Sequence, residues 1–109
     1  MNEKWKAFDL EKLLSDYIGS NETWHKFLDK DTLITGIYIL SSGAMDEQLI
    51  HKMDEVYLVL EGKATLKIEN DTYEAKKGSI FYVKANIEHK FINIEKEIIV
   101  LVFFSKVSP

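Results

Sequence analysis

Apolar residues near the start of the chain follow the period of an amphipathic helix. Five of them fall at positions i, i+3, i+4, i+7 and i+8, which places them on one helix face: Leu10, Leu13, Leu14, Tyr17 and Ile18. Asp9 precedes them as a suitable N-cap, and Gly19 follows as a natural end. A helix of about ten residues is marginal alone, so we expect it to pack against a sheet.

The remainder of the chain has the pattern of short strands. Runs that are apolar on one or both faces, rich in Val, Ile, Leu, Tyr and Phe, cover 33–40, 55–60, 64–69, 72–75, 79–83, 90–94 and 97–104. Asn70 and Asp71 form a turn signal between two of these runs. No second helical pattern separates the strands, which predicts an antiparallel sandwich or barrel, an architecture that also removes exposed strand edges.

Length, charge and composition narrow the class of protein. The 109 residues suit one domain, and the absence of cysteine excludes disulfides and thiolate metal sites. A net charge of -4, with lysines mixed among acids, argues against a nucleic-acid partner. The longest apolar run spans seven residues, whereas a membrane helix needs about 20. Met1–Lys6 has no apolar signal core. We therefore expect a cytoplasmic protein with no membrane partner.

The chain has three histidines, at positions 25, 51 and 89, and imidazole is the commonest metal ligand in proteins. On a straight strand His51 and Glu55 would lie roughly 13 Å apart, too far to share an ion, so the chain would have to reverse between them. Glu55 would then open a strand with Tyr57 on the same face. His89 would come from a third strand. A helix through 51–55 is an alternative, and so is a purely structural role for each residue.

The spacing of glycines and metal-type residues resembles the two motifs of the cupin superfamily. The first motif matches at Gly43, His51, Glu55 and Gly62, and the second matches at Gly78, His89 and Asn93. The proline and glycine of the second motif are replaced by Lys84 and Asn86, and Asn tolerates the left-handed backbone that glycine favours.

The chain is thus identified as a small single-domain cupin of the cupin 2 conserved-barrel type. The resemblance implies an all-β double-stranded β-helix, the cupin jelly-roll barrel, with a short N-terminal α-helix. We expect residues 1–30 to form a helix and arm that pack on the barrel of residues 31–109.

The resemblance also implies a site for a divalent metal ion, of the Fe, Mn, Ni or Zn class. His51, Glu55 and His89 carry over as ligands, whereas Leu49 stands where the family has another histidine. Gln48 is the best candidate to replace that ligand, with Asp46 and Glu47 as weaker ones. Loss of the metal is the alternative.

Two functions remain open from the sequence. In the first, the chain is a metal-binding cupin that binds or acts on a small polar molecule, as a dioxygenase, isomerase or lyase, with Glu55 and Tyr57 as catalytic groups. In the second, it is a non-catalytic cupin for small-ligand binding or interaction, with a degraded metal site. The sequence leaves open whether the protein is an enzyme. Because small cupins commonly pair, we expect a homodimer.

Overall fold

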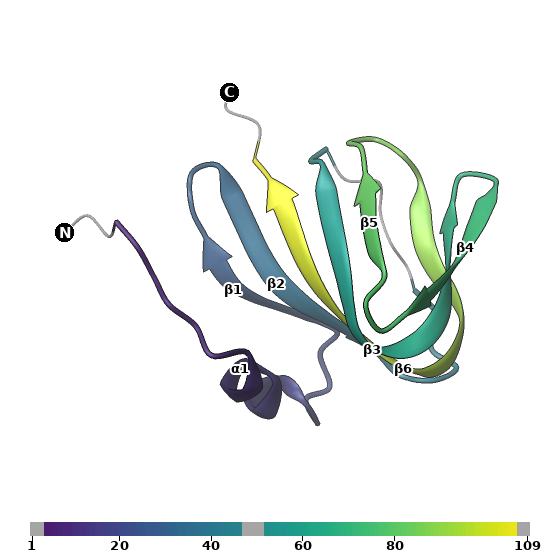
Figure 1. Ribbon diagram of the computed structural model, residues 1–109, viewed down its shortest axis with the longest axis horizontal. Coiled ribbons are helices and arrows are strands. Elements are labelled where there is room, and N and C mark those ends of the chain that lie inside the picture. The colour runs from purple at the N-terminus through teal and green to yellow at the C-terminus, as the bar shows by residue number, and fades with distance from the viewer. Residues whose placement is uncertain (1–3, 47–51, 107–109) are drawn as a thin grey trace.

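A computed structural model describes residues 4–46 and 52–106 of the chain. One helix is followed by six strands in the order α1 (Leu10–Tyr17), β1 (Trp24–Asp29), β2 (Leu33–Leu40), β3 (Glu55–Ile68), β4 (Asp71–Lys76), β5 (Ile80–Val83) and β6 (His89–Ser105) (Figure 1). The fold is therefore all-β with a short N-terminal helix, as the sequence predicts.

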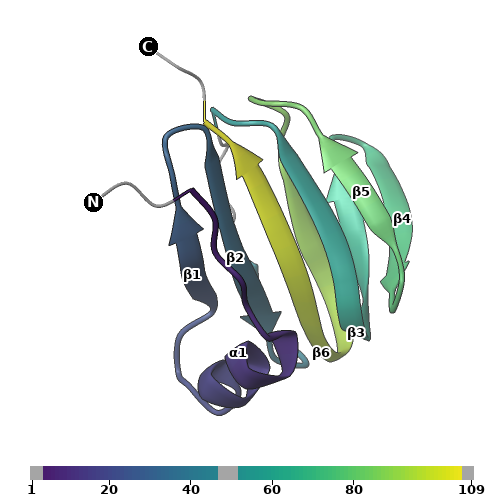
Figure 2. The same cartoon turned by 60° about the vertical axis from the view of Figure 1, so that its left-hand side comes forward.

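The helix begins and ends where the sequence predicts. The Asp9 carboxylate accepts a hydrogen bond from the Glu11 backbone N–H at 3.0 Å, which satisfies a group that the first turn leaves without a partner. After the helix, Gly19 takes a positive φ of 90°. The Tyr17 ring stacks on His25 of β1 with 4.4 Å between ring centroids. Figure 2 shows α1 and the arm before it lying over β1 and β2.

The six strands form one antiparallel sheet in the order β1-β2-β6-β3-β4, with β5 also paired to β3. Strand β5 pairs with the first residues of β3, and β4 pairs with its last residues. The sheet curls strongly (Figure 1), as expected of a cupin jelly roll. Among the described strands, no ladder joins β1 to β4 or β5, so their pairing leaves the barrel open along that side.

Strands β3 and β6 are each continuous where the sequence predicts two strands. The predicted interruption in β3 coincides with an irregular stretch of the β3–β6 ladder, with register shifts between Val59 and Thr65. Gly62 lies in this stretch with φ 101°, and a Cβ there would come within 2.1 Å of the Glu97 carbonyl oxygen. The glycine therefore bends the strand without ending it.

The core lies inside the curled sheet and consists of inward-facing residues of β2, β3, β4 and β6: Leu40, Tyr57, Val59, Ala64, Leu66, Ala75, Phe91, Ile94, Ile98, Val100, Val102 and Phe104. Trp24 packs against this core from β1, a strand that the sequence pattern does not single out. Because β1 pairs with β2, residues 24–29 of the expected arm are part of the sheet. The division at residue 30 stays a prediction.

In residues 4–46 and 52–106, no helix is long and apolar enough to cross a membrane.

Candidate functional site

Three polar side chains from two strands meet inside the barrel: Glu55, Tyr57 and His89. Glu55 and Tyr57 are two residues apart on β3, so both point to its inner face. His89 opens β6, where its backbone pairs with Ile68 at the other end of β3. A straight strand from Glu55 to Ile68 would be roughly 40 Å long. The curl of the sheet therefore brings His89 to Glu55.

The three side chains are almost completely removed from solvent and hydrogen-bonded to one another. Glu55 and Tyr57 are each 1% exposed, and His89 is 4% exposed. His89 Nε2 lies 2.7 Å from Glu55 Oε2 and 2.9 Å from the Tyr57 hydroxyl. The Tyr57 hydroxyl donates to Glu55 Oε1 at 3.1 Å. A carboxylate, a phenol and an imidazole thus form a closed triangle.

The protonation of His89 follows from its neighbours. Nδ1 lies 2.7 Å from the Ile87 carbonyl oxygen, which can only accept, so Nδ1 carries a proton. Burial lowers the pKa of His89, but hydrogen bonds to the Glu55 carboxylate and the Ile87 carbonyl outweigh this effect and raise the pKa above its ordinary value. When Nε2 is protonated as well, it donates to Glu55, and the positive charge of the ring then offsets that of the buried carboxylate.

A second buried polar cluster lies nearby, and its contacts were not predicted from the sequence. Asp46 Oδ1 accepts from the Tyr38 hydroxyl at 2.5 Å, and Oδ2 accepts from the Phe91 backbone N–H at 2.8 Å. Burial raises the pKa of Asp46, although both hydrogen bonds oppose the rise. Burial and the adjacent Asp46 raise the pKa of Tyr38 as well. No local sequence signal pairs these residues, because they lie in different strands and in the loop after β2.

Three predicted site residues fall outside the described part of the chain, namely His51, Gln48 and the weaker candidate Glu47, and so does Leu49. The reversal predicted between His51 and Glu55 therefore stays a prediction, as does the fourth ligand. Within residues 4–46 and 52–106, no three His, Cys, Asp or Glu side chains gather as a metal-binding group. Of the predicted ligands, the structure describes Glu55 and His89, which it brings together. It also describes the weaker candidate Asp46, whose two oxygens accept from Tyr38 and Phe91.

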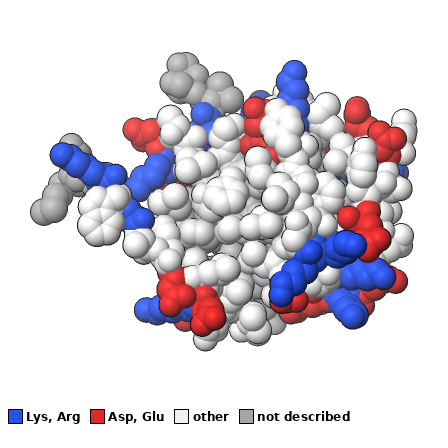
Figure 3. Space-filling view, in the orientation of Figure 1, with Lys and Arg blue, Asp and Glu red and all other residues white. Residues whose placement is uncertain are grey.

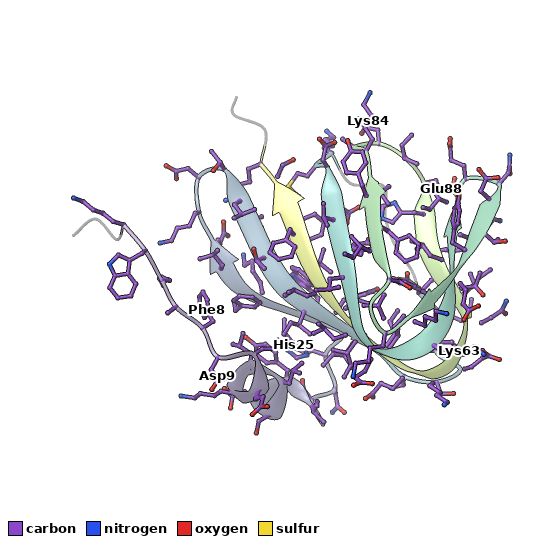
Figure 4. The ribbon with its side chains drawn as sticks, viewed as in Figure 1. Phe8, Asp9, His25, Lys63, Lys84 and Glu88 are labelled. Carbon is purple, nitrogen blue, oxygen red and sulfur yellow. The ribbon has the colours of Figure 1, made fainter. Side chains whose placement is uncertain are left out.

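The third histidine belongs to a different part of the molecule. His25 stacks on Tyr17 and lies with its Nε2 3.0 Å from the Glu22 carbonyl oxygen, to which it donates. Figure 4 shows His25 beside the helix, on the side of the sheet where Phe8 and Asp9 also lie. These contacts give His25 a packing role under α1.

Glu55 and His89 suit a divalent metal ion of the predicted class. The Ile87 carbonyl accepts from His89 Nδ1, as a carbonyl commonly does behind a histidine ligand, and this orients Nε2 toward Glu55. One imidazole nitrogen and one carboxylate are donors that Fe, Mn, Ni and Zn accept. The donor set therefore fits the ion, with further ligands still needed.

Comparisons with known proteins give a matching family model and a relative of similar length. The family model of the cupin domain, Cupin_2, matches residues 36–105. An uncharacterized protein of Streptomyces coelicolor is 36% identical over 100 residues, covering 92% of this chain and 95% of its own.

Two solved structures extend the likeness of the fold. TT1209 from Thermus thermophilus has a TM-score of 0.74 at 20% identity, covering 93% of this chain and 97% of its own. The conserved SPY1581 protein of Streptococcus pyogenes, of unknown function, has a TM-score of 0.73 at 19% identity, covering 99% and 93%. The matched residues 36–105 include strands β3 to β6, which carry Glu55, Tyr57 and His89. This chain belongs to the cupin family.

Proposed function

We propose that this cupin holds one divalent metal ion inside its barrel and binds or acts on a small polar molecule beside it. His89, Glu55 and His51 would hold the ion, with Gln48 as the candidate fourth ligand. The observation that carries the proposal is the buried triangle of Glu55, Tyr57 and His89, whose members are 1–4% exposed.

The cost of burying this triangle supports a functional role. Removing a carboxylate and an imidazolium from water costs several kcal/mol per ion, which an ion pair offsets only with good geometry and further hydrogen bonds. The neighbouring inward positions Val59, Val100 and Val102 show that this interior accommodates aliphatic side chains. Three polar groups at the same depth are more easily explained by ligand chemistry than by stability.

The bound ion would polarise a carbonyl or enol oxygen of the substrate, or bind O2. The protein's own groups would handle protons. The Glu55 carboxylate would accept one, and the Tyr57 hydroxyl, which donates to Glu55 Oε1, would donate one. Such a site suits a dioxygenase, an isomerase or a lyase acting on a small polar molecule.

A non-catalytic ligand-binding cupin is the second candidate, and a specific observation favours it. Every buried side-chain nitrogen and oxygen of the described residues has a hydrogen-bond partner without any metal. Leu49 also replaces a ligand of the family motif. A barrel of this kind would bind its ligand whether or not a metal is present.

Metal content tests the first candidate. Untagged protein purified without added metal is analysed for Fe, Mn, Ni and Zn, next to the variants His51→Ala and His89→Ala. We expect near-stoichiometric metal in the wild type and loss in both variants. His25→Ala is the matched control, because His25 is also buried but lies under α1. A wild type that stays empty after incubation with each ion would contradict metal binding and support the second candidate.

We also propose that the protein is a cytoplasmic homodimer without a nucleic-acid partner. The net charge of -4 disfavours a polyanion, and a two-fold dimer is the commonest closed assembly of soluble proteins. Sedimentation equilibrium of the untagged chain measures the assembly directly. A monomer at high protein concentration would contradict this part of the proposal while leaving the metal site untouched.

A further inference from the structure

The outer surface of the sheet differs sharply on the two sides of the irregular stretch at Gly62, although the same strands β3 and β6 run through both. Beyond Gly62, outward positions carry mostly charged and hydroxyl side chains. They are Lys63, Thr65 and Lys67 on β3, with Lys90 and Lys96 opposite them on β6 and Thr72, Glu74 and Lys76 on β4. Lysine and threonine are what a solvated sheet face requires.

Before Gly62, the outward positions are apolar on three adjacent strands. We call these six residues the outer apolar face: Val56 and Leu58 on β3, Ile80 and Tyr82 on β5, and Leu101 and Phe103 on β6. Val56 pairs with both Tyr82 and Phe103, and Leu58 pairs with both Ile80 and Leu101, so the six form two continuous rows. Ile80 is 69% exposed and Tyr82 is 61% exposed. Exposed apolar side chains do not help a monomer to stay in solution, so this surface needs another explanation.

The outer apolar face continues into a groove under the N-terminal arm. Leu101 and Phe103 line this groove of about 730 Å³ together with Phe27 and Leu33 of the sheet and Trp5 and Phe8 of the arm. Phe8 is held against Phe27 with ring centroids 4.8 Å apart, whereas Trp5 is 81% exposed. The arm thus presents a large aromatic side chain next to an apolar groove without burying it.

The exposed area matches what a dimer needs. A fully exposed aromatic side chain offers about 150–250 Å² and an aliphatic one less, so the outer apolar face and Trp5 together leave on the order of 600 Å² of apolar surface open. This area is at the upper end for the largest patch of a typical monomer, about 300–600 Å². It approaches the roughly 800 Å² that each partner contributes to a standard interface.

The character of the face points to a second copy of this chain. A two-fold interface brings the same patch of both subunits together, so the patch must be complementary to its own copy. None of the six residues of the outer apolar face is charged, and no like charges therefore meet when the face is paired with itself. In the orientation of Figure 1, Figure 3 shows uncharged side chains across the middle of the molecule and charged ones mainly near the margins. Figure 4 places Lys63 and Lys84 toward opposite margins of the same view.

We infer that two copies of this chain pair through the outer apolar face, with Trp5 of each arm packed against the other copy. This inference rests on the homodimer of the proposed function and assigns its surface. Inward-facing Glu55, Tyr57 and His89 lie on the opposite side of the sheet, so pairing leaves the buried triangle intact.

Sedimentation equilibrium on untagged full-length protein tests the interface with matched charge substitutions. Ile80→Glu places a carboxylate on the face at an exposed edge-strand position. Thr72→Glu is the control, because Thr72 also lies exposed and outward on an edge strand paired with β3. We expect a wild-type dimer, an Ile80→Glu dissociation constant raised by about 30–100-fold, and an unchanged control. The substitution Trp5→Ala is expected to raise the dimer dissociation constant by at least about tenfold.

Two outcomes would overturn the inference: a wild type that is monomeric at high concentration, or an Ile80→Glu variant as dimeric as the wild type. Circular dichroism verifies that each variant is folded, and elemental analysis of the same samples reports the metal site separately. A dimer without metal would contradict the metal proposal alone. A metal-loaded monomer would contradict both the homodimer and its interface, and a dimeric Ile80→Glu variant would contradict the interface alone.

Discussion

Two buried carboxylates inside this barrel are satisfied in different ways. Glu55 is bound by the imidazole of His89 and the phenol of Tyr57, both of which can gain or lose a proton. Asp46 is bound by the Tyr38 hydroxyl and by the backbone N–H of Phe91, and this amide N–H does not titrate. Through these two hydrogen bonds, both oxygens of Asp46 hold the loop after β2 against β2 and β6.

The difference indicates that Asp46 holds the fold together, whereas Glu55 belongs to the proposed site. Asp46 ties two parts of the backbone together, so its removal leaves a hydroxyl and an amide buried without partners. The partners of Glu55 are side chains that can exchange protons. A proton on His89 lies in a position that also suits another cation. Burial alone does not distinguish the two, since Asp46 is 7% exposed and Glu55 is 1% exposed. The chemistry of the partners does.

The largest stability effect is expected at Asp46. Asp46→Ala should lower the free energy of unfolding by about 2–5 kcal/mol, because two buried hydrogen-bonding groups lose their acceptor. Urea denaturation measures this loss, and Tyr38→Phe should cost less because the backbone bond to Phe91 remains. Metal content per folded chain should stay at the wild-type value. A loss of metal with intact stability would make Asp46 a ligand instead.

Glu55→Gln should show the opposite profile. The amide keeps the shape of the side chain and can still hydrogen-bond to Tyr57 and to a neutral His89, so the free energy of unfolding should fall by only about 1–2 kcal/mol. Bound metal should be lost, because an amide is a much poorer ligand than a carboxylate. Elemental analysis and urea denaturation of one preparation test both statements. Equal metal content in variant and wild type would contradict the role of Glu55.

Tyr57→Phe isolates the hydroxyl of the triangle. It removes one hydrogen bond to Glu55 and should lower the free energy of unfolding by about 1 kcal/mol. The metal should remain bound, since Tyr57 is proposed to move protons and not to hold the ion. Calorimetric metal titration distinguishes these roles, and a metal-free Tyr57→Phe protein would make the phenol part of the ligand set.

The smallest effect is expected at an exposed carboxylate. Hydrogen bonds from Lys106 and then Lys26 hold the pKa of Asp29 at about 2. An unfolded Asp has a pKa of about 3.9, so this stabilisation is fully present above that value and is lost as the pH falls through about 2. Asp29→Asn should lower Tm by less than about 2 °C at neutral pH. The difference from wild type should shrink between about pH 4 and pH 2, and a constant difference would show that charge is not its cause.

Local sequence patterns predicted the elements better than their continuity. The helix period and the Asp9 cap placed α1, and β2 spans the predicted residues 33–40. Asn86 takes the predicted left-handed backbone with φ 67°. The pattern predicted breaks in β3 and β6 because Gly62 and the charges around 95–96 resemble turn signals. In the structure, cross-strand pairing on either side carries both strands through these points.

The amino-acid sequence limits which residues can carry the proposed chemistry. Without cysteine, any metal site must use nitrogen and oxygen, and the motif spacing selected Glu55 and His89. Their contact depends on the tertiary structure, because Glu55 begins β3 whereas His89 pairs with the far end of that strand. The same folding set Asp46 against Tyr38 and Phe91 and left one half of the outer surface apolar. Local patterns report which face of a strand is apolar, but the curl of the sheet decides which faces and which strand ends meet.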